Sequence, residues 1–183
     1  MKVTSTAIPD VKLIEPKAFA DDRGFFLESW HRDKFAAAGI DCSFAQDNHS
    51  RSKRGTLRGL HYQKHPGQAK LLRCVRGAIW DVAVDIRPGS PTFGRWVAEE
   101  LSEQNQRMLF IPVGFAHGFV VLSEEADVMY KCSNVYVAET EAGIAWDDPD
   151  VRVAWPVKDP VLSQRDRTNP RLRELYPQAF GPR

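Results

Sequence analysis

Three side chains that could move a proton or hold an anion stand close together in this sequence: Arg58, His61 and Lys70. An imidazole has an ordinary pKa of about 6.5, so it can accept a proton near neutral pH. Arg58 stays charged and can bind a phosphate or carboxylate with two parallel hydrogen bonds. The spacing predicts a proton-transfer site beside an anion site, although a lone histidine is more often a buried structural residue.

A second histidine, His117, follows a proline and glycine turn in segment 112–119 and begins an apolar stretch. This segment resembles the second half of the cupin signature. Metal-binding cupins supply two histidines one residue apart and a later glutamate, because a divalent ion needs several ligands converging from one side. Here Gln63 stands two residues after His61, and no glutamate follows at the matching spacing. The remaining histidines lie on other segments: His31, His49 and His65. The pattern predicts a jelly-roll barrel without a catalytic metal.

Other common chemistries lack their sequence signals. The chain has no Gly-x-Ser-x-Gly elbow, and none of its cysteines adjoins a histidine in a recognisable catalytic pattern. Neither a Walker A loop nor a Gly-x-Gly-x-x-Gly sequence occurs, which argues against NTP hydrolysis and dinucleotide oxidoreduction. Acid and base chemistry by His, Tyr, Lys and Asp side chains inside a β-barrel remains.

Length and composition fit a single globular domain over residues 1–183, of which 43% are hydrophobic and 27% charged. No apolar run has the length of a membrane span or an export signal, so we expect a cytoplasmic protein without membrane contact. Lys and Arg number 25 against 24 Asp and Glu, so no global field would attract nucleic acid. Three widely spaced cysteines argue against a disulfide framework: Cys42, Cys74 and Cys132.

Glycine and proline turns recur at short intervals and separate segments of strand length. Segment 80–86 alternates, which predicts a strand with one packed face and a second face that presents Asp81 and Asp85. Further strands are predicted over residues 25–30, 69–75, 94–101, 107–111, 117–122, 128–135 and 143–146.

Helix signals are scarce. An alanine run before Gly39 predicts a short helix over residues 31–38, and Asn169-Pro170 can open another over 171–175. Polar residues 163–170 are expected to run over the surface, where they could close over a pocket. These elements together predict a mainly β protein, a cupin-type jelly-roll barrel or sandwich. Its core is expected at about 25–150, with an N-terminal arm and a C-terminal segment carrying a short helix.

Eight ordered blocks resemble the dTDP-4-dehydrorhamnose 3,5-epimerases, which are metal-free, cupin-like enzymes of dTDP-L-rhamnose synthesis. The resemblance extends from Thr6 to about Pro170. The matching blocks are residues 22–29, 46–50, 57–63, 70–74, 81–87, 90–94, 112–119 and 130–131. So many blocks in order favour a functional role for His61 over a structural one.

The resemblance implies a substrate, dTDP-4-dehydro-6-deoxy-D-glucose, whose C4 ketone acidifies the protons on C3 and C5. Inversion at each carbon needs a base, an acid on the opposite face and a group that holds the enolate charge. His61 matches the base and Asp166 the carboxylate that aligns it, while Tyr130 matches the acid and Lys70 the cation near the enolate. No cofactor is implied, and the product would feed cell-envelope polysaccharide.

Positions that contact the nucleotide sugar in the family are matched here by Arg23, Glu28, Gln46, Asp47, Asn48, Arg58, Lys70, His117, Tyr136, Glu141 and Arg165. The two arginines Arg23 and Arg58 suit the pyrophosphate, and Tyr136 matches an aromatic that stacks on thymine. Arg165 departs from the lysine of some relatives, and the two cations differ in geometry. The resemblance also implies a homodimer in which an N-terminal strand crosses to the partner.

Three alternatives stay open. An epimerase acting on one carbon for another dTDP-deoxysugar pathway would exchange deuterium at C3 or C5 alone. A non-catalytic nucleotide-sugar binding domain would exchange at neither carbon. A metal-dependent cupin would contain stoichiometric metal and lose activity with a chelator.

Overall fold

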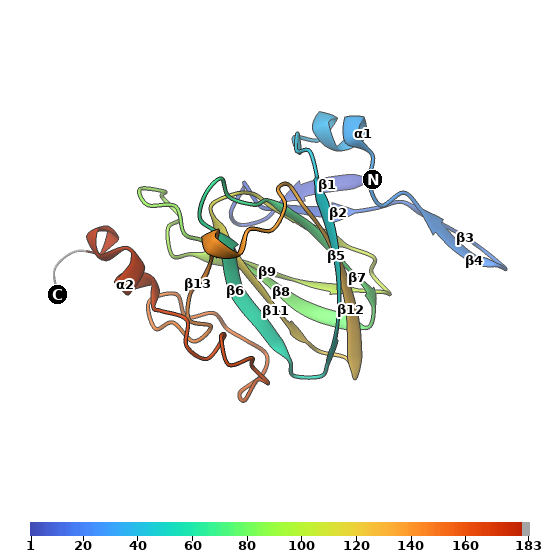
Figure 1. Cartoon of the computed structure of the whole chain (residues 1–183). Coiled ribbons are helices and arrows are strands. Elements are labelled where there is room, and N and C mark those ends of the chain that lie inside the picture. Colours follow the sequence, from blue (N-terminus) through green and yellow to red (C-terminus); the bar gives the residue numbers. More distant parts are fainter. Residues whose placement is uncertain (181–183) are drawn as a thin grey trace.

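The computed structural model describes residues 1–180, and within them most of the regular structure is β-strand. Two antiparallel sheets face each other, with short helices at the periphery (Figure 1). The predicted mainly β, jelly-roll type of fold is confirmed. No helix among the described residues is both long and apolar enough to cross a bilayer.

The first sheet has six strands in the order β1 (Lys2–Ser5), β2 (Lys12–Glu15), β10 (Met108–Ile111), β7 (Lys70–Arg76), β12 (Glu125–Cys132) and β5 (Gln46–Lys53). The second has five in the order β13 (Glu141–Gly143), β6 (Leu57–Gln63), β11 (Phe115–Val121), β8 (Ala78–Asp85) and β9 (Trp96–Ser102). Sequence neighbours such as β11 and β12 lie in different sheets, so the chain crosses repeatedly between the layers.

The main core lies between the two sheets. Alternation along each strand sends every second side chain inward, so that Leu72 and Cys74 of β7 meet Ile79 and Ala83 of β8. Burying one such aliphatic side chain contributes roughly 1.5–3 kcal/mol. The rest of this core consists of Ile8, Val11, Val97, Leu101, Leu109, Ile111, Phe115, Phe119, Val121, Ala126 and Val128.

Two smaller cores cover the outer faces of the sheets. Helix α2 (Leu172–Leu175) and the C-terminal segment pack on the five-stranded sheet, where Leu172 joins Leu60 and Val84. Helix α1 (Arg32–Ala37) packs Phe35 against the six-stranded sheet. Two 3-10 helices complete the elements, Ala138–Thr140 and Pro177–Ala179. The C-terminal segment is therefore held against the sheet that carries His61.

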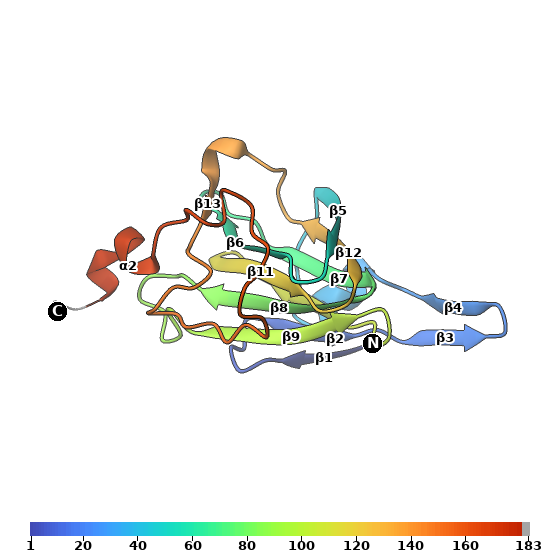
Figure 2. The same cartoon turned by 90° about the horizontal axis from the view of Figure 1, so that it is seen from below.

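A hairpin of β3 (Ala18–Asp21) and β4 (Gly24–Leu27) extends away from the body of the molecule (Figures 1 and 2). It carries three exposed aromatic side chains, Phe19, Phe25 and Phe26, and Phe26 is 69% exposed. Exposed aromatic side chains grouped in this way are typical of interaction surfaces.

Most of the predicted strands fall on observed ones, with ends displaced by a few residues. The strand predicted over 143–146 is wrong, since it shares only Gly143 with β13, which ends at that residue. The strand predicted over 128–135 is β12, which begins and ends three residues earlier. Segment 80–86 does form β8, but Asp81 and Asp85 are fully buried, because both faces of this strand are covered. Both short helices are present as well.

The strands that sequence patterns failed to predict include β5 and β6. Strand β5 reads QDNHSRSK and shows no apolar alternation, because its inward side chains line a polar hollow and most of its outward ones meet solvent. Strands β1 and β2 also lie in the six-stranded sheet, where β2 pairs with β10.

Candidate active site

Strands β6 and β11 place two histidines side by side on the inner face of the five-stranded sheet, since His61 pairs in register with His117. The strands approach closely because Gly59 and Gly118 face each other. A Cβ on Gly59 would lie 2.5 Å from the Cα of Gly118. The register shifts between His117 and Phe119, which marks a local irregularity in this strand pair. Glycine at positions 59 and 118 therefore lets the two strands come close enough to bring the imidazoles of His61 and His117 together.

The His61 side chain is 27% exposed, and its ring contacts a buried carboxylate. Its Nε2 lies 2.5 Å from Oδ1 of Asp166, which is 3% exposed. This contact makes Nε2 the donor and leaves Nδ1 as the basic nitrogen when the ring is neutral. Burial acts to raise the pKa of Asp166, but the His61 hydrogen bond and charge outweigh it, so the pKa lies below its ordinary value.

Asp166 reaches His61 because the C-terminal segment is tied to β6 and to the segment after β13. Val161 bridges Thr56, its carbonyl accepts from Leu57 N at 3.0 Å, and Asp166 N donates to Ser163 Oγ at 3.1 Å. Gly143 leaves room for Asn169, since a Cβ there would lie 2.7 Å from that side chain. The expected surface run over 163–170 thus folds back over the end of the sheet.

A second carboxylate–imidazole pair lies deeper. Nε2 of His117 is 2.9 Å from Oδ2 of Asp81, and both residues are buried. Burial lowers the pKa of His117, and burial raises the pKa of Asp81. Asp81 was not among the site residues predicted from the sequence. Its place inside the apolar run of β8 was the available signal, since burial of a carboxylate requires a partner.

Lys70 and Tyr130 come from the facing sheet, on the neighbouring strands β7 and β12. Lys70 has no ion-pair or hydrogen-bond partner among residues 1–180, and burial lowers the pKa of its amine. Burial also raises the pKa of the Tyr130 phenol, which therefore keeps its proton near neutral pH. The site thus opposes an imidazole on one sheet with a proton donor and a cation on the other.

Strand β5 forms the polar edge of the site. Arg58 Nε donates to Ser52 Oγ at 2.9 Å, so the guanidinium lies against this strand, and these contacts use only part of its five donors. Gln46 Nε2 donates to Asn48 Oδ1 at 2.9 Å, and Asn48 Nδ2 donates to Cys132 Sγ at 3.5 Å. Arg58 is therefore positioned to receive an anion at the edge of the site.

Three residues expected to contact the substrate meet at the mouth. Tyr136 is 51% exposed, and its hydroxyl donates to Glu141 Oε2 at 2.6 Å. Arg165 forms an ion pair with the same carboxylate at 2.5 Å. Burial acts to raise the pKa of Glu141, but the hydrogen bonds from Tyr136 and Arg165 outweigh it and lower the pKa. Glu141 therefore links the segment between β12 and β13, which carries Tyr136, to the C-terminal segment, which carries Asp166.

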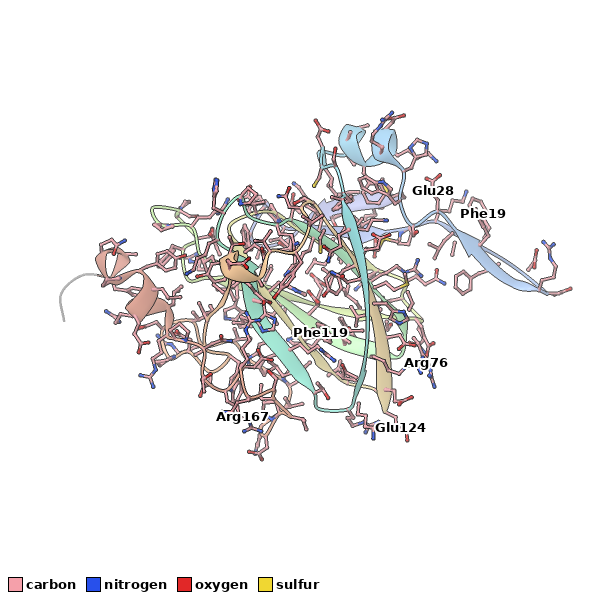
Figure 3. All side chains as sticks on the ribbon, in the orientation of Figure 1. Phe19, Glu28, Arg76, Phe119, Glu124 and Arg167 are labelled. Carbon is pink, nitrogen blue, oxygen red and sulfur yellow. The ribbon has the colours of Figure 1, made fainter. Side chains whose placement is uncertain are left out.

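Three other expected contacts lie outside this site in the single chain. Asp47 points to the opposite face of β5 and pairs with Lys131 at 3.0 Å. Glu28 pairs with Lys34 near the hairpin base, away from Phe119 in the interior (Figure 3). Arg23 stands at the hairpin turn and binds Asp21. The structure does not bring these three residues to His61 within one copy of the chain.

Two adjoining hollows of about 440 Å³ and about 410 Å³ lie between the sheets and form one cleft. Both are lined by Ser50, Arg58, His61, Lys70, Tyr130 and Glu141. No group of three or more His, Cys, Asp or Glu side chains that could hold a metal is found in residues 1–180. Gln63, at the position of the missing second histidine, instead accepts from Thr140 Oγ1 at 2.7 Å. Sequence reasoning missed the contact of Gln63 with Thr140 and the contact of Ser163 with the backbone of Asp166.

Comparison with known proteins identifies the family of this chain. A family model described as dTDP-4-dehydrorhamnose 3,5-epimerase matches residues 5–174. The dTDP-4-dehydrorhamnose 3,5-epimerase of Pseudomonas aeruginosa is 56% identical over 169 residues, which cover 91% of this chain and 93% of that protein. The dTDP-4-dehydrorhamnose 3-epimerase of Streptomyces niveus is 43% identical over 169 residues, covering 91% and 82%.

Among solved structures, the dTDP-6-deoxy-D-glucose-3,5-epimerase of Legionella pneumophila in complex with dTDP-4-keto-L-rhamnose superposes with a TM-score of 0.93. It is 45% identical, and the match covers 100% of this chain and 98% of that one. Such similarity over nearly the full length, together with the matched blocks around the cleft, leads to one conclusion. The chain belongs to the dTDP-4-dehydrorhamnose 3,5-epimerase family.

Proposed function

We propose that this enzyme converts dTDP-4-dehydro-6-deoxy-D-glucose to dTDP-4-dehydro-L-rhamnose by inverting C3 and C5. The observation that carries the proposal is the opposition of His61, backed by Asp166, to Tyr130 and Lys70 across one cleft. Epimerisation beside a ketone needs a base and an acid on opposite faces of the ring, which matches this arrangement.

In the proposed reaction, Nδ1 of His61 takes the proton from C3 or C5, and the electron pair moves onto the C4 oxygen. Asp166 stabilises the imidazolium that forms. Lys70 faces the enolate oxygen. Burial lowers the pKa of this amine, and no side chain of residues 1–180 pairs with it. An enolate anion formed beside the amine would therefore raise its pKa.

Tyr130 then donates its proton to the opposite face of the same carbon, which completes the inversion. Its raised pKa keeps the phenol protonated until the carbanion forms. Between the two inversions, solvent removes the proton that His61 has gained and returns a proton to Tyr130. His117, positioned by Asp81, would donate to a sugar oxygen from the deep end of the cleft.

For the nucleotide, we propose that Arg58 binds the pyrophosphate and that Tyr136 stacks on the thymine ring. Gln46 and Asn48 would contact the nucleotide from β5, while Glu141 and Arg165 would close the mouth. The cationic side of the cleft, formed by Arg58 and Lys70, supports this placement, because two phosphates bring negative charge that the near-neutral chain does not otherwise attract.

The dimer is part of the proposal. A hairpin that extends from the body with three exposed phenylalanines would be covered if it crossed to a second copy. Such a crossing would carry Arg23 and Glu28 toward the neighbour's cleft. Size-exclusion chromatography with light scattering tests this idea: deletion of residues 18–27 should convert a dimer to a monomer, and a monomeric full-length chain would contradict it.

A cytoplasmic location is proposed as well, and three free thiols fit a reducing compartment. Cell fractionation tests it.

Solvent deuterium incorporation tests the reaction. In D₂O, the wild type should place deuterium at both C3 and C5 of the substrate, as read by NMR. His61→Asn should abolish exchange, while the matched control His65→Asn, at an exposed turn position, should behave as the wild type. Exchange at one carbon alone would indicate the 3-epimerase activity named for the Streptomyces niveus relative. An absence of exchange in the wild type would indicate a binding domain.

A further inference from the structure

The inner face of β5 carries four polar side chains in a row, at every second position from Gln46 to Ser52. Three of them are engaged: Gln46 and Asn48 with each other, and Ser52 with Arg58. The fourth is Ser50, whose Oγ is buried and has no hydrogen-bond partner in the described part of the chain. An unpaired buried hydroxyl costs roughly 1–3 kcal/mol, so its retention requires an explanation.

Ser50 lines both halves of the cleft, together with His61, Lys70 and Tyr130. It pairs in register with Val128, one step deeper than the pair formed by Asn48 and Tyr130. Its side chain therefore lies on the wall that faces His61. A molecule bound between the two sheets would supply the missing partner.

The position of Arg58 indicates which part of the substrate comes close. Its guanidinium bonds to Ser52 Oγ at 2.9 Å and to the carbonyl of Arg51 at 3.5 Å, the two residues that follow Ser50. With the pyrophosphate on Arg58, the sugar carbons nearest to the phosphates, C1 and C2, come beside Ser50. The proposed substrate has ring hydroxyls only at C2 and C3, and the C3 hydroxyl moves during inversion, whereas the C2 hydroxyl stays in place.

We propose that Ser50 hydrogen-bonds the C2 hydroxyl of the ketohexose and thereby holds the ring in register with His61 through both inversions. This inference rests on the proposed epimerase function. Ser50 is thus a substrate-binding residue that selects sugars carrying a C2 hydroxyl. The hydroxyl of Ser50 both donates and accepts, so it can adapt to a sugar hydroxyl of either polarity.

A cycle of one enzyme change and one substrate change tests the proposal. Wild type and Ser50→Ala are each assayed for kcat/KM with dTDP-4-dehydro-6-deoxyglucose and with its 2-deoxy analogue. Ser50→Ala should lose about tenfold on the normal substrate, as expected for one hydrogen bond. On the 2-deoxy analogue it should lose less than about twofold, because the partner hydroxyl is already absent.

Equal losses of the variant on both substrates would overturn the proposal, and so would no loss on either. Ser43→Ala serves as the control, since it removes an exposed hydroxyl just before β5. If Ser50→Ala fails to fold, Ser50→Cys provides the same comparison with nearly unchanged volume. The wild type also separates the two hypotheses: absence of exchange there refutes the epimerase function, whereas normal exchange without coupling refutes only the role of Ser50.

Discussion

Replacement of Asp166 by Asn measures how much a buried carboxylate contributes to proton abstraction by His61. The substitution keeps shape and volume, so the backbone contact of Asp166 N with Ser163 should persist. It removes the negative charge that faces Nε2 of His61 at 2.5 Å. It also introduces an amide N–H₂ that can donate to Nε2, which favours the tautomer with the proton on Nδ1, the nitrogen that must be basic.

The size of the effect follows from the contact. A hydrogen bond to a charged group contributes roughly 1.5–3 kcal/mol, against about 1 kcal/mol for a neutral one. The change therefore removes about 1–2 kcal/mol of imidazolium stabilisation, and selection of the wrong tautomer adds to this loss. At about 1.4 kcal/mol per factor of ten, the lost stabilisation alone should lower kcat by about 5- to 30-fold, and the wrong tautomer should lower it further. KM should change little, because the Asp166 carboxylate is engaged with the His61 ring.

The assay is deuterium exchange at C3 and C5 together with steady-state turnover, with dTDP affinity measured by calorimetry. Asp159→Asn is the matched control, since this exposed carboxylate belongs to the same C-terminal segment. A kcat within about threefold of the wild type, with a folded variant and unchanged dTDP affinity, would refute the reasoning that Asp166 assists His61.

Three further predictions concern other parts of the fold. Tyr130→Phe should reduce one inversion more than the other, which NMR of the product mixture would reveal as accumulation of a singly inverted sugar; unchanged rates at both carbons would contradict its role as the acid. Gly118→Ala should lower Tm by roughly 4–8 °C, because the new Cβ would lie 2.8 Å from the Arg58 carbonyl, and an unchanged Tm would show that the strands can separate. Hydrogen bonds from Arg87, Ser90 and Thr92 outweigh burial and lower the pKa of Asp85 to about 2. Its contribution of about 2 kcal/mol is thus present above pH 3.8 and is lost as pH falls toward 2, and acid titration of Asp85→Asn should show a shallower loss of stability in that range.

Sequence reasoning succeeded where apolar side chains alternate with others along a strand. The alternation in segment 80–86 predicted a strand, and β8 is there. It failed at β5, because a strand that lines a polar cleft on one face and meets solvent on most of the other has no hydrophobic period to detect.

The missed strand also explains why one expected contact lies elsewhere. Gln46, Asp47 and Asn48 resemble a single contact block in sequence. A strand sends alternate side chains to opposite faces, so Gln46 and Asn48 enter the cleft while Asp47 binds Lys131 outside. Recognition of the strand would have predicted this division.

The pairing of His61 with Asp166 could not have come from spacing, since 105 positions separate the two residues. It depends on a segment that has little regular structure and is held by backbone contacts to the turn before β6 and to the residues after β13. Asp81 had a local signal, a carboxylate in a buried strand, but its partner His117 lies on another strand. Only the three-dimensional register of β8 and β11 brings them together.

Lys70 shows how the site reduces the stability of the fold, and a substitution tests this relation. Its amine is held inside the cleft with no partner among residues 1–180, and burial lowers its pKa. Lys70→Met keeps the length of the side chain without the charge, so it should raise stability by about 1 kcal/mol, or roughly 2–4 °C in Tm, while turnover falls by orders of magnitude. Because folding lowers the pKa of Lys70, the charged amine opposes folding below that pKa. The wild type should therefore gain stability relative to Lys70→Met as pH rises toward the ordinary lysine value of 10.5. A variant that is less stable at every pH would show that Lys70 supports the fold, and would remove the argument that its unpaired charge is retained for the enolate.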